Sequence, residues 1–459
     1  MTGSGRHRRR ERRWLLALGL PALLALAQQQ WLLRRPPRLL TLEAAAASAG
    51  PAALQARFSR PVDTSSLQAQ SRLQPPLAHR WHGEGDRVML SLAPGQRLTA
   101  PLTLELAGRD RRGLPLPPGR WRWDPRPRLL AVVPAAGGGE RLQLRDHDGR
   151  WRSLTPPVAR ILALEPLGDG SGIAFSSEAA DGGVRVWRLP LQQSPLVGGG
   201  AAPPPASPPP PQAGRAEALG PGGLGFAHLS ADRRGALLLQ AGGPLPGEPQ
   251  TLYWPAGGGG PQTLPIRATG PIRLLPEGGA AVVPEAEGLG LHTLPPRPPG
   301  RQTLPGSRDL SSFCPQAGRA LLVRHWPDYR RSLERVEPGR PPRQLWIGEE
   351  ALVASACAGG GDQVWALLVA GTGRPELTLL ALDGEGRVQR RQRLAGWELE
   401  PGTGLGLDPT GHQLLASLRP LGPAGAPPQP PRPVLIDARS FALRPLPITA
   451  RLAIWLPPG

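Results

Sequence analysis

The sequence predicts an all-β protein with three parts: an N-terminal signal or anchor helix, an Ig-like β-sandwich and a seven-bladed β-propeller. Apolar runs of strand length recur from residue 54 to residue 456, broken by residues that disfavour strand interiors. The chain of 459 residues holds 60 Gly and 61 Pro without a collagen period, which favours many short strands joined by tight turns. From residue 127 onward the pattern repeats, as expected of propeller blades.

Residues 1–35 form an export signal. Six Arg between Arg6 and Arg13 precede the unbroken apolar run Trp14–Ala27. Cleavage after Ala27, at a small-x-small site, would release the protein into the periplasm. If the apolar segment instead continues to Leu33, it has about the 20 residues that span a bilayer. The expected location is then the inner membrane, with the basic side in the cytoplasm and the later domains in the periplasm.

The positive charge of the chain is mostly scattered. The net charge is +19 and all 54 basic residues are Arg, because the sequence contains no Lys. Residues 1–35 carry +7 of this charge, and +12 is spread over the other 424 residues. Such a surface favours acidic partners, such as anionic lipid or polysaccharide. A nucleic-acid partner is not expected, because the aromatic residues do not alternate with Arg clusters.

Residues 38–124 predict the small sandwich. Apolar runs at 54–58, 86–92, 101–106 and 120–123 are separated by turn-rich stretches. The run FSRPVDTSSLQAQSRLQPPL (58–77), followed by TLELAGRDRRGLPL (103–116), resembles bacterial Ig-like domains of the surface-layer type. This resemblance implies a short helix after the FSRPVD turn and a role as a spacer. Arg109, Asp110 and Arg111 are interpreted as a solvated turn.

Residues 309–347 show the repeating unit of the predicted propeller most clearly. Four strand-length runs, 310–314, 320–325, 332–337 and 343–347, alternate with turns rich in Gly, Pro and Arg. Four antiparallel strands form one blade, which needs copies of itself to bury both faces.

Seven such units occupy residues 127–459. They align at the turn before each second strand, at Pro127, Ser171, Arg234, Gly279, Gly318, Gly361 and Gly411. The two longest intervals contain Pro-rich insertions at 198–214 and 420–433. The turns FCPQAGRALL (313–322), LSADRRGALL (229–238) and LDPTGHQLL (407–415) resemble the repeat signature of TolB-like, WD-type propellers.

Two further predictions concern closure and crosslinking. The first unit begins at its second strand, 128–133, so residues 451–456 are expected to supply its missing inner strand. Cys314 and Cys357 each lie four residues before an aligned Gly, which places them on inner strands of adjacent blades. A disulfide between them is expected, with two buried thiols as the alternative.

One cluster is the candidate binding site: Arg324, His325, Trp326, Asp328, Tyr329 and Arg330. It lies in a second-to-third-strand loop, where small turn residues are usual, and holds one of the two Tyr of the chain. We expect this loop to lie near the mouth of the central channel and to bind a partner. The alternative is a large loop packed on a neighbouring blade.

No catalytic residue, metal site or cofactor is predicted. Asp146, Asp148 and Gly149 look like the start of a calcium loop, as does Asp383-Gly384, but both lack the acidic twelfth residue. They are interpreted as hairpin turns between third and fourth strands.

The expected function is a non-catalytic cell-envelope protein that binds or scaffolds a protein or glycan partner. The alternative is a propeller enzyme that acts on an envelope polysaccharide or another periplasmic substrate. That class calls for convergent carboxylates, whereas the acidic residues of this chain fall mostly in turns.

Overall fold

The computed structural model confirms the all-β class, with nine β-sheets among the residues it describes. The described residues are 28–30, 34–47, 50–193, 196–200, 208–243, 245, 247, 249–371, 375–422 and 427–457. The predicted signal or anchor segment lies almost wholly outside them. In the described part of the chain, no helix has the length and apolar character needed to cross a membrane.

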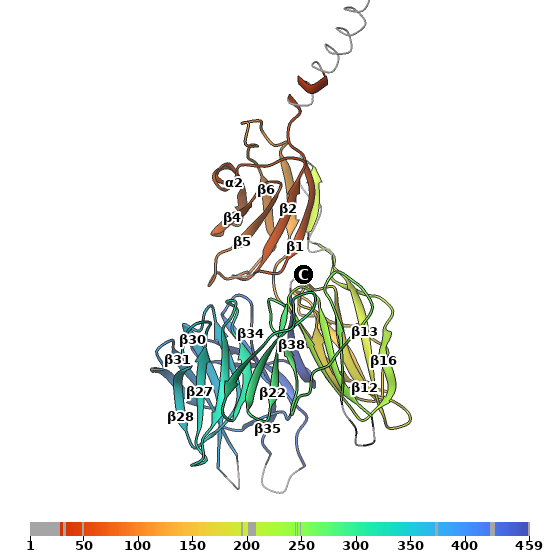
Figure 1. The fold of residues 1–459 in the computed structure, drawn as a ribbon, viewed down its shortest axis with the longest axis vertical. Helices are drawn as coiled ribbons and strands as arrows, with labels where there is room; N and C mark the ends of the chain where they lie inside the picture. The colour runs from red at the N-terminus through yellow and green to blue at the C-terminus, as the bar shows by residue number, and fades with distance from the viewer. Residues whose placement is uncertain are drawn as a thin grey trace, which may run out of the picture.

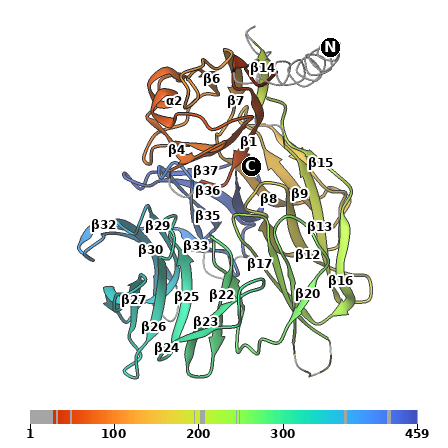
Figure 2. The ribbon, with the colours of Figure 1, turned by 45° about the horizontal axis from the view of Figure 1, so that its top comes forward.

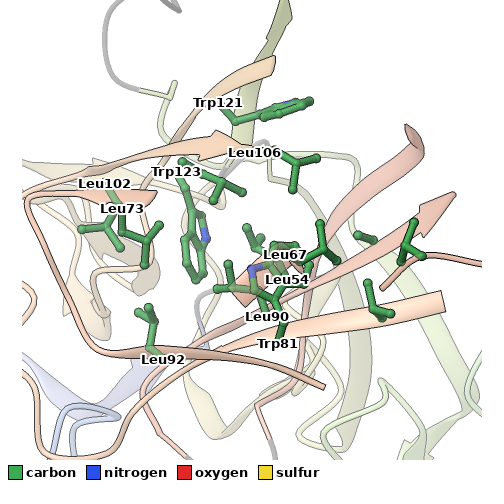
Figure 3. Close-up of a cluster of buried hydrophobic side chains, with 14 of the residues drawn as sticks. Leu54, Leu67, Leu73, Trp81, Leu90, Leu92, Leu102, Leu106, Trp121 and Trp123 are labelled. Atoms are coloured by element: carbon green, nitrogen blue, oxygen red, sulfur yellow. The ribbon is translucent and has the colours of Figure 1, made fainter. Parts of the chain in front are cut away.

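Two four-stranded sheets pack face to face at the N-terminal end of the protein (Figure 1). One has the order β1 (Leu39–Ala45), β2 (Ala53–Phe58), β5 (Arg87–Leu92), β4 (His79–Glu84); the other has β14 (Leu196–Gly200), β7 (Gly119–Trp123), β6 (Leu102–Leu106), β3 (Arg72–Gln74). Side chains alternate between buried and exposed along most of these strands. The inner faces therefore meet in one apolar core, which contains Leu54 and Leu90 of one sheet and Leu102 and Trp123 of the other (Figure 3).

The short helix expected after the FSRPVD turn is α2 (Thr64–Gln70). Its N-cap is Asp63, whose Oδ1 accepts the backbone N–H of Ser65 at 3.1 Å. The interpretation of residues 109–111 as a solvated turn is wrong for Asp110. This side chain is buried, and its Oδ1 accepts the N–H groups of Arg112 and Leu114, both at 2.9 Å. The carboxylate thus holds the turn together from inside.

The sandwich also contains a strand that the sequence pattern assigned to the propeller. The insertion predicted at 198–214 begins with β14, which pairs with β7 at the edge of the sandwich. Gly198 and Gly199 have φ values of 132° and 120°, which favour glycine. A Cβ on Gly198 would lie 2.3 Å from the Arg120 carbonyl oxygen. A glycine run is typical of a loop, yet here it allows close contact with β7.

The other seven sheets form the blades of a propeller (Figures 1 and 2). In ring order from the inside outward, they are: blade one, β38 (Arg451–Leu456), β8 (Arg128–Pro134), β9 (Glu140–Arg145), β10 (Trp151–Ser153); blade two, β11 (Ile161–Pro166), β12 (Gly172–Glu178), β13 (Val184–Gln192), β15 (Gln212–Ala213) with β16 (Glu217–Leu224); blade three, β17 (Phe226–Ala231), β18 (Leu237–Gly242), β19 (Gln250–Trp254), β20 (Gln262–Leu264); blade four, β21 (Arg273–Leu274), β22 (Ala280–Glu285), β23 (Gly288–Thr293), β24 (Arg301–Pro305); blade five, β25 (Arg308–Phe313), β26 (Ala320–His325), β27 (Arg331–Val336), β28 (Arg343–Gly348); blade six, β29 (Ala351–Ala358), β30 (Gln363–Ala370), β31 (Glu376–Asp383), β32 (Val388–Arg393); blade seven, β33 (Trp397–Leu399) and β34 (Leu405–Leu407), β35 (Gln413–Pro420), β36 (Arg432–Asp437), β37 (Leu443–Pro445).

The ring closes as predicted, because β38 pairs antiparallel with β8. Arg451 at the start of β38 donates from Nε and Nη2 to the two oxygens of Glu140, at 2.7 and 2.6 Å. Its Nη2 also donates to the carbonyl oxygen of Ile161 in blade two, at 2.5 Å. The last strand therefore joins blade one to blade two.

The innermost strand of each blade has no partner strand on its channel side. Its free backbone N–H and C=O groups therefore need hydrogen bonds from other groups. Glu165 of blade two accepts the N–H of Ala231 in blade three at 2.9 Å. Arg273 of blade four donates to the carbonyl oxygen of Leu229 at 3.1 Å. Burial raises the pKa of Glu165, against the lowering effect of Arg273 and the Ala231 N–H. We interpret this carboxyl as a cap on the inner edge of blade three.

A buried polar cluster fixes the link between sandwich and propeller. Asp124 accepts hydrogen bonds from Nε and Nη2 of Arg126, both at 2.8 Å. His147, from the turn between β9 and β10, places Nδ1 at 3.0 Å from Asp124 and Nε2 at 3.1 Å from the Arg126 carbonyl oxygen. The linker between β7 and β8 is thereby held against blade one.

Candidate functional site

The predicted recognition cluster forms the turn between β26 and β27 of blade five. The N–H of Trp326 donates to the carbonyl oxygen of Arg330 at 3.0 Å, and the N–H of Tyr329 donates to that of Trp326 at 3.1 Å. Blade strands are antiparallel, so this turn lies at the opposite end of the blade from the turn that joins β25 to β26. We call the propeller face that carries the second-to-third-strand turns the loop face.

The turn lies between the second and third strands of blade five rather than beside its innermost strand. Strands β26 and β27 are second and third from the centre, so their turn lies outward from the inner strand. The large cleft at the channel lies on the other face, between the propeller and the sandwich, and residues 324–331 do not line it.

Blade five itself holds the side chains of the cluster. Trp326 donates from Nε1 to Ser332 Oγ at 2.9 Å, and the guanidinium carbon of Arg324 lies 3.8 Å from the centre of the Trp326 ring. This Arg also lies 3.6 Å from Glu334. The Trp ring is therefore fixed in one orientation, with a cation on its face.

Two side-chain pairs flank this stack. Arg330 donates from Nε to Asp328 at 2.7 Å, within the turn. His325 Nε2 lies 2.7 Å from Asp309, on β25. Every contact described for these six predicted residues stays within blade five, and none joins the turn to a neighbouring blade in the described part of the chain.

Tyr329 is the unusual residue of the turn. Its side chain is 93% exposed and its backbone φ is 65°, in the left-handed region. Six other turns of the described chain make the same pair of backbone hydrogen bonds. The equivalent residue in each is a glycine with positive φ: Gly113, Gly138, Gly149, Gly182, Gly235 and Gly386. Tyr329 therefore occupies a position where this fold otherwise uses the residue without a Cβ.

Packing explains the other non-glycine residues with positive φ among the described residues. Phe441 has a φ of 59° and is fully buried in the core between blades six and seven. Leu452, with a φ of 51°, packs on the core of blades one and two. Tyr329 has no such packing.

A second exposed apolar side chain lies on the loop face. Leu245, in the connection between β18 and β19 of blade three, is 80% exposed. It follows Tyr329 in exposure among the large hydrophobic residues that the structure describes. Sequence inspection missed Leu245, because one Leu in a Gly- and Pro-rich loop carries no signal.

The opposite face bears a cleft of about 1000 Å³ between sandwich and propeller. Its walls come from the end of β1, from the β5–β6 loop and from first-to-second-strand turns of several blades. Cys357 lines it and is joined to Cys314 by a disulfide between blades six and five, with 5.3 Å between the Cα atoms. Sequence patterns carry no sign of the cleft, because it exists only where two domains meet.

The two Asp-Gly stretches that look like calcium loops are hairpin turns. Asp383, the last residue of β31, accepts the N–H groups of Glu385 and Arg387 at 2.9 and 2.8 Å. Asp146, between β9 and β10, pairs with Arg152 at 2.9 Å. In the described residues, no group of three or more His, Cys, Asp or Glu side chains is arranged to hold a metal ion.

Comparison with known proteins shows similarity in fold alone. No family model and no curated protein matches the sequence. The solved structures that resemble it include TolB from Acinetobacter baumannii, with 14% identity over 65% of this chain and 77% of that one and a TM-score of 0.38. A putative 6-phosphogluconolactonase from Bacteroides uniformis shows 13% identity, coverage of 72% and 99%, and a TM-score of 0.46. AztD from Citrobacter koseri shows 12% identity, coverage of 74% and 98%, and a TM-score of 0.44.

Proposed function

We propose that this chain is a non-catalytic binding or scaffolding protein of the cell envelope, and that its propeller binds a protein partner through the loop face. In this proposal, residues 1–35 direct export or anchor the chain in the inner membrane. The sandwich, which resembles a bacterial Ig-like domain, acts as a spacer between membrane and propeller.

The observation that carries the proposal is the strained, exposed Tyr329. A left-handed backbone costs a non-glycine residue about 1 kcal/mol or more. Such strain persists where it serves a function, and in this turn no buried contact offsets it. Exposed aromatic side chains with few rotamers are typical anchors of protein interfaces. Trp326 and the flanking Arg330–Asp328 pair supply further contacts in the same turn.

Two measurements test this proposal. A photo-reactive amino acid at position 329, in cells that make the full chain, is expected to give a discrete crosslinked protein. The same group at Val388, which is 57% exposed on the outer edge of blade six, is the matched control. Crosslinks of equal yield at both positions, or to glycan alone, would overturn the proposal.

The second measurement separates binding from folding. Tyr329→Gly is expected to stabilise the protein by about 1 kcal/mol, because the turn no longer holds a Cβ in the left-handed region. The same variant is expected to lose the crosslinked partner in pull-downs. A loss of stability would instead mean that the side chain is needed for packing.

A further inference from the structure

The two Pro-rich insertions of the propeller differ in how far solvent reaches them. In the insertion after β13, Pro208 and Pro211 are buried. In the insertion between β35 and β36, residues 427–430 are all exposed. Two stretches of similar composition thus have different environments, and the second presents its prolines to a partner.

The proline content of the exposed segment restricts its conformation. Four of the five residues 427–431 are Pro. Each proline ring holds φ at about −65° and removes a backbone N–H, and Gln429 is itself kept out of the helical region by the Pro that follows it. The segment makes no strand pairing, and β36 begins to pair only at Arg432, opposite Leu418. These constraints favour a polyproline II helix.

The C-terminal end of the segment is attached to the link between β37 and β38. The carbonyl oxygen of Pro431 accepts the N–H of Ala450 at 3.0 Å, and that of Pro433 accepts the N–H of Leu446 at 2.9 Å. The prolines and these bonds leave little chain for a partner to order. Association therefore carries a small entropic cost.

A polyproline II helix would arrange these residues as an apolar ridge. It has three residues per turn, so Pro427 and Pro430 lie on one edge, and Pro428 and Pro431 lie on the adjoining edge. Arg432 follows the ridge directly. Its side chain is exposed, and it forms no ion pair with another described residue. The ridge thus ends in a cation that is free to pair with a partner.

The ridge lies on the loop face, because β35 and β36 are the second and third strands of blade seven. Grooves lined with aromatic side chains bind ridges of this kind, and a carboxylate beside the groove pairs with a flanking Arg. We propose that residues 427–432 are a docking site for a partner domain that has an aromatic-lined groove and an adjacent carboxylate. This site is separate from Tyr329, which lies in blade five.

The first test uses the full chain and, as a probe, a purified fluorescent SH3 domain chosen for a carboxylate beside its aromatic groove. We expect saturable binding. Pro427→Ala with Pro430→Ala should weaken it about tenfold or more, because the ridge and its preorganised backbone are lost. Pro209→Ala with Pro210→Ala removes two prolines from the insertion after β13 and should have little effect. Thermal melting checks that each variant remains folded.

A second test concerns the charge at the end of the ridge. Arg432→Gln should weaken probe binding about fivefold or more, and the difference should shrink as salt rises. A probe that lacks its carboxylate should bind the native chain and the Arg432→Gln variant equally. Arg80→Gln, at an exposed position of β4, changes the net charge equally and should have little effect. Equal losses at Arg432 and Arg80 would contradict a specific ion pair.

The third test looks for the natural partner. A photo-reactive amino acid at Gln429, in cells that make the full chain, should crosslink a discrete protein. Mass spectrometry should locate the crosslink in an aromatic-lined groove. An adduct that persists in the variant lacking Pro427 and Pro430, or no saturable binding of the probe, would overturn the proposal. Tyr329→Gly should leave probe binding unchanged, so failure here and failure of the Tyr329 proposal are distinguishable.

Discussion

At the scale of single residues, the Asp124 cluster shows how a charge at a domain junction becomes part of the fold. The Asp124 side chain is 3% exposed. Burial by itself raises the pKa of a carboxyl, yet the hydrogen bonds from Arg126 and His147 outweigh burial and hold the pKa of Asp124 far below its ordinary value of 3.8. The folded protein therefore binds this proton less readily than the unfolded chain does.

We expect Asp124→Asn to reduce the free energy of unfolding by about 2–4 kcal/mol at pH 7, because the change leaves the partly buried Arg126 without its anion. The stabilising effect of Asp124 is complete above its unfolded pKa of about 4 and fades as the pH falls through its folded pKa. Urea unfolding at pH 7, 5 and 3 measures this, and the difference between variant and native protein should shrink at pH 3.

A surface pair provides the control for that experiment. Arg57 and Asp86 lie 3.9 Å apart with side chains about half exposed, so Asp86→Asn should cost less than about 1 kcal/mol. If Asp124→Asn costs the same at pH 3 as at pH 7, the carboxylate charge is not what stabilises the junction.

The sequence reveals unusual residue types in a turn, but it does not reveal the backbone conformation of each residue. The cluster at 324–331 was visible because a Tyr, a Trp and several Arg stand where small turn residues are usual. The left-handed backbone of Tyr329 was not visible, since it emerges only from comparison with six glycine turns of the same geometry. Asp110 was misjudged because a charged triplet gives no sign that its central carboxylate turns inward.

At the scale of elements, strand β38 closes the ring by pairing and by a side-chain clamp. It covers the free edge of β8, and its Ala453 and Leu456 are buried. Arg451 adds bonds to Glu140 and Ile161 across two blades. The closure could be predicted from the sequence, because the first blade lacked its inner strand and one strand remained after the seventh blade was complete.

Removal of residues 449–459 should cost several kcal/mol, because one strand is unpaired and apolar surface is exposed. The bared edge of β8 should also promote self-association, which light scattering after size-exclusion chromatography detects. Arg451→Met keeps the strand and should cost less, about 1–3 kcal/mol. Arg150→Met, in an exposed pair with Asp148, is the control. A truncated protein with native stability and no self-association would mean that β38 does not close the ring.

At the scale of the whole molecule, sandwich and propeller are joined twice. The chain passes once through the linker after Trp123, and the insertion after β13 carries β14 to the sandwich before the chain returns to β15. The propeller repeat could be predicted from the sequence, because the strands of most blades follow one another directly in the chain. Neither the second connection nor the cleft was readable, because both depend on contacts between distant segments.

The second connection should hold the sandwich in place over the propeller. Valine at positions 198 and 199 cannot adopt the backbone of β14, and its Cβ at 198 would collide with the Arg120 carbonyl oxygen. We therefore expect Gly198→Val with Gly199→Val to detach β14 and leave the outer edge of β7 unpaired. Hydrogen exchange of the backbone N–H groups of residues 120–123 should speed up, while exchange in blades three to six stays unchanged.

The matched control is Gly257→Val, which places the same strain in an exposed turn with no atom near the new Cβ. Unchanged exchange in β7 would show that β14 contributes nothing to the sandwich. If β14 does fix the sandwich, its release should also let the β5–β6 loop move away from blade seven, where His412 Nε2 lies 3.2 Å from the Gly95 carbonyl oxygen.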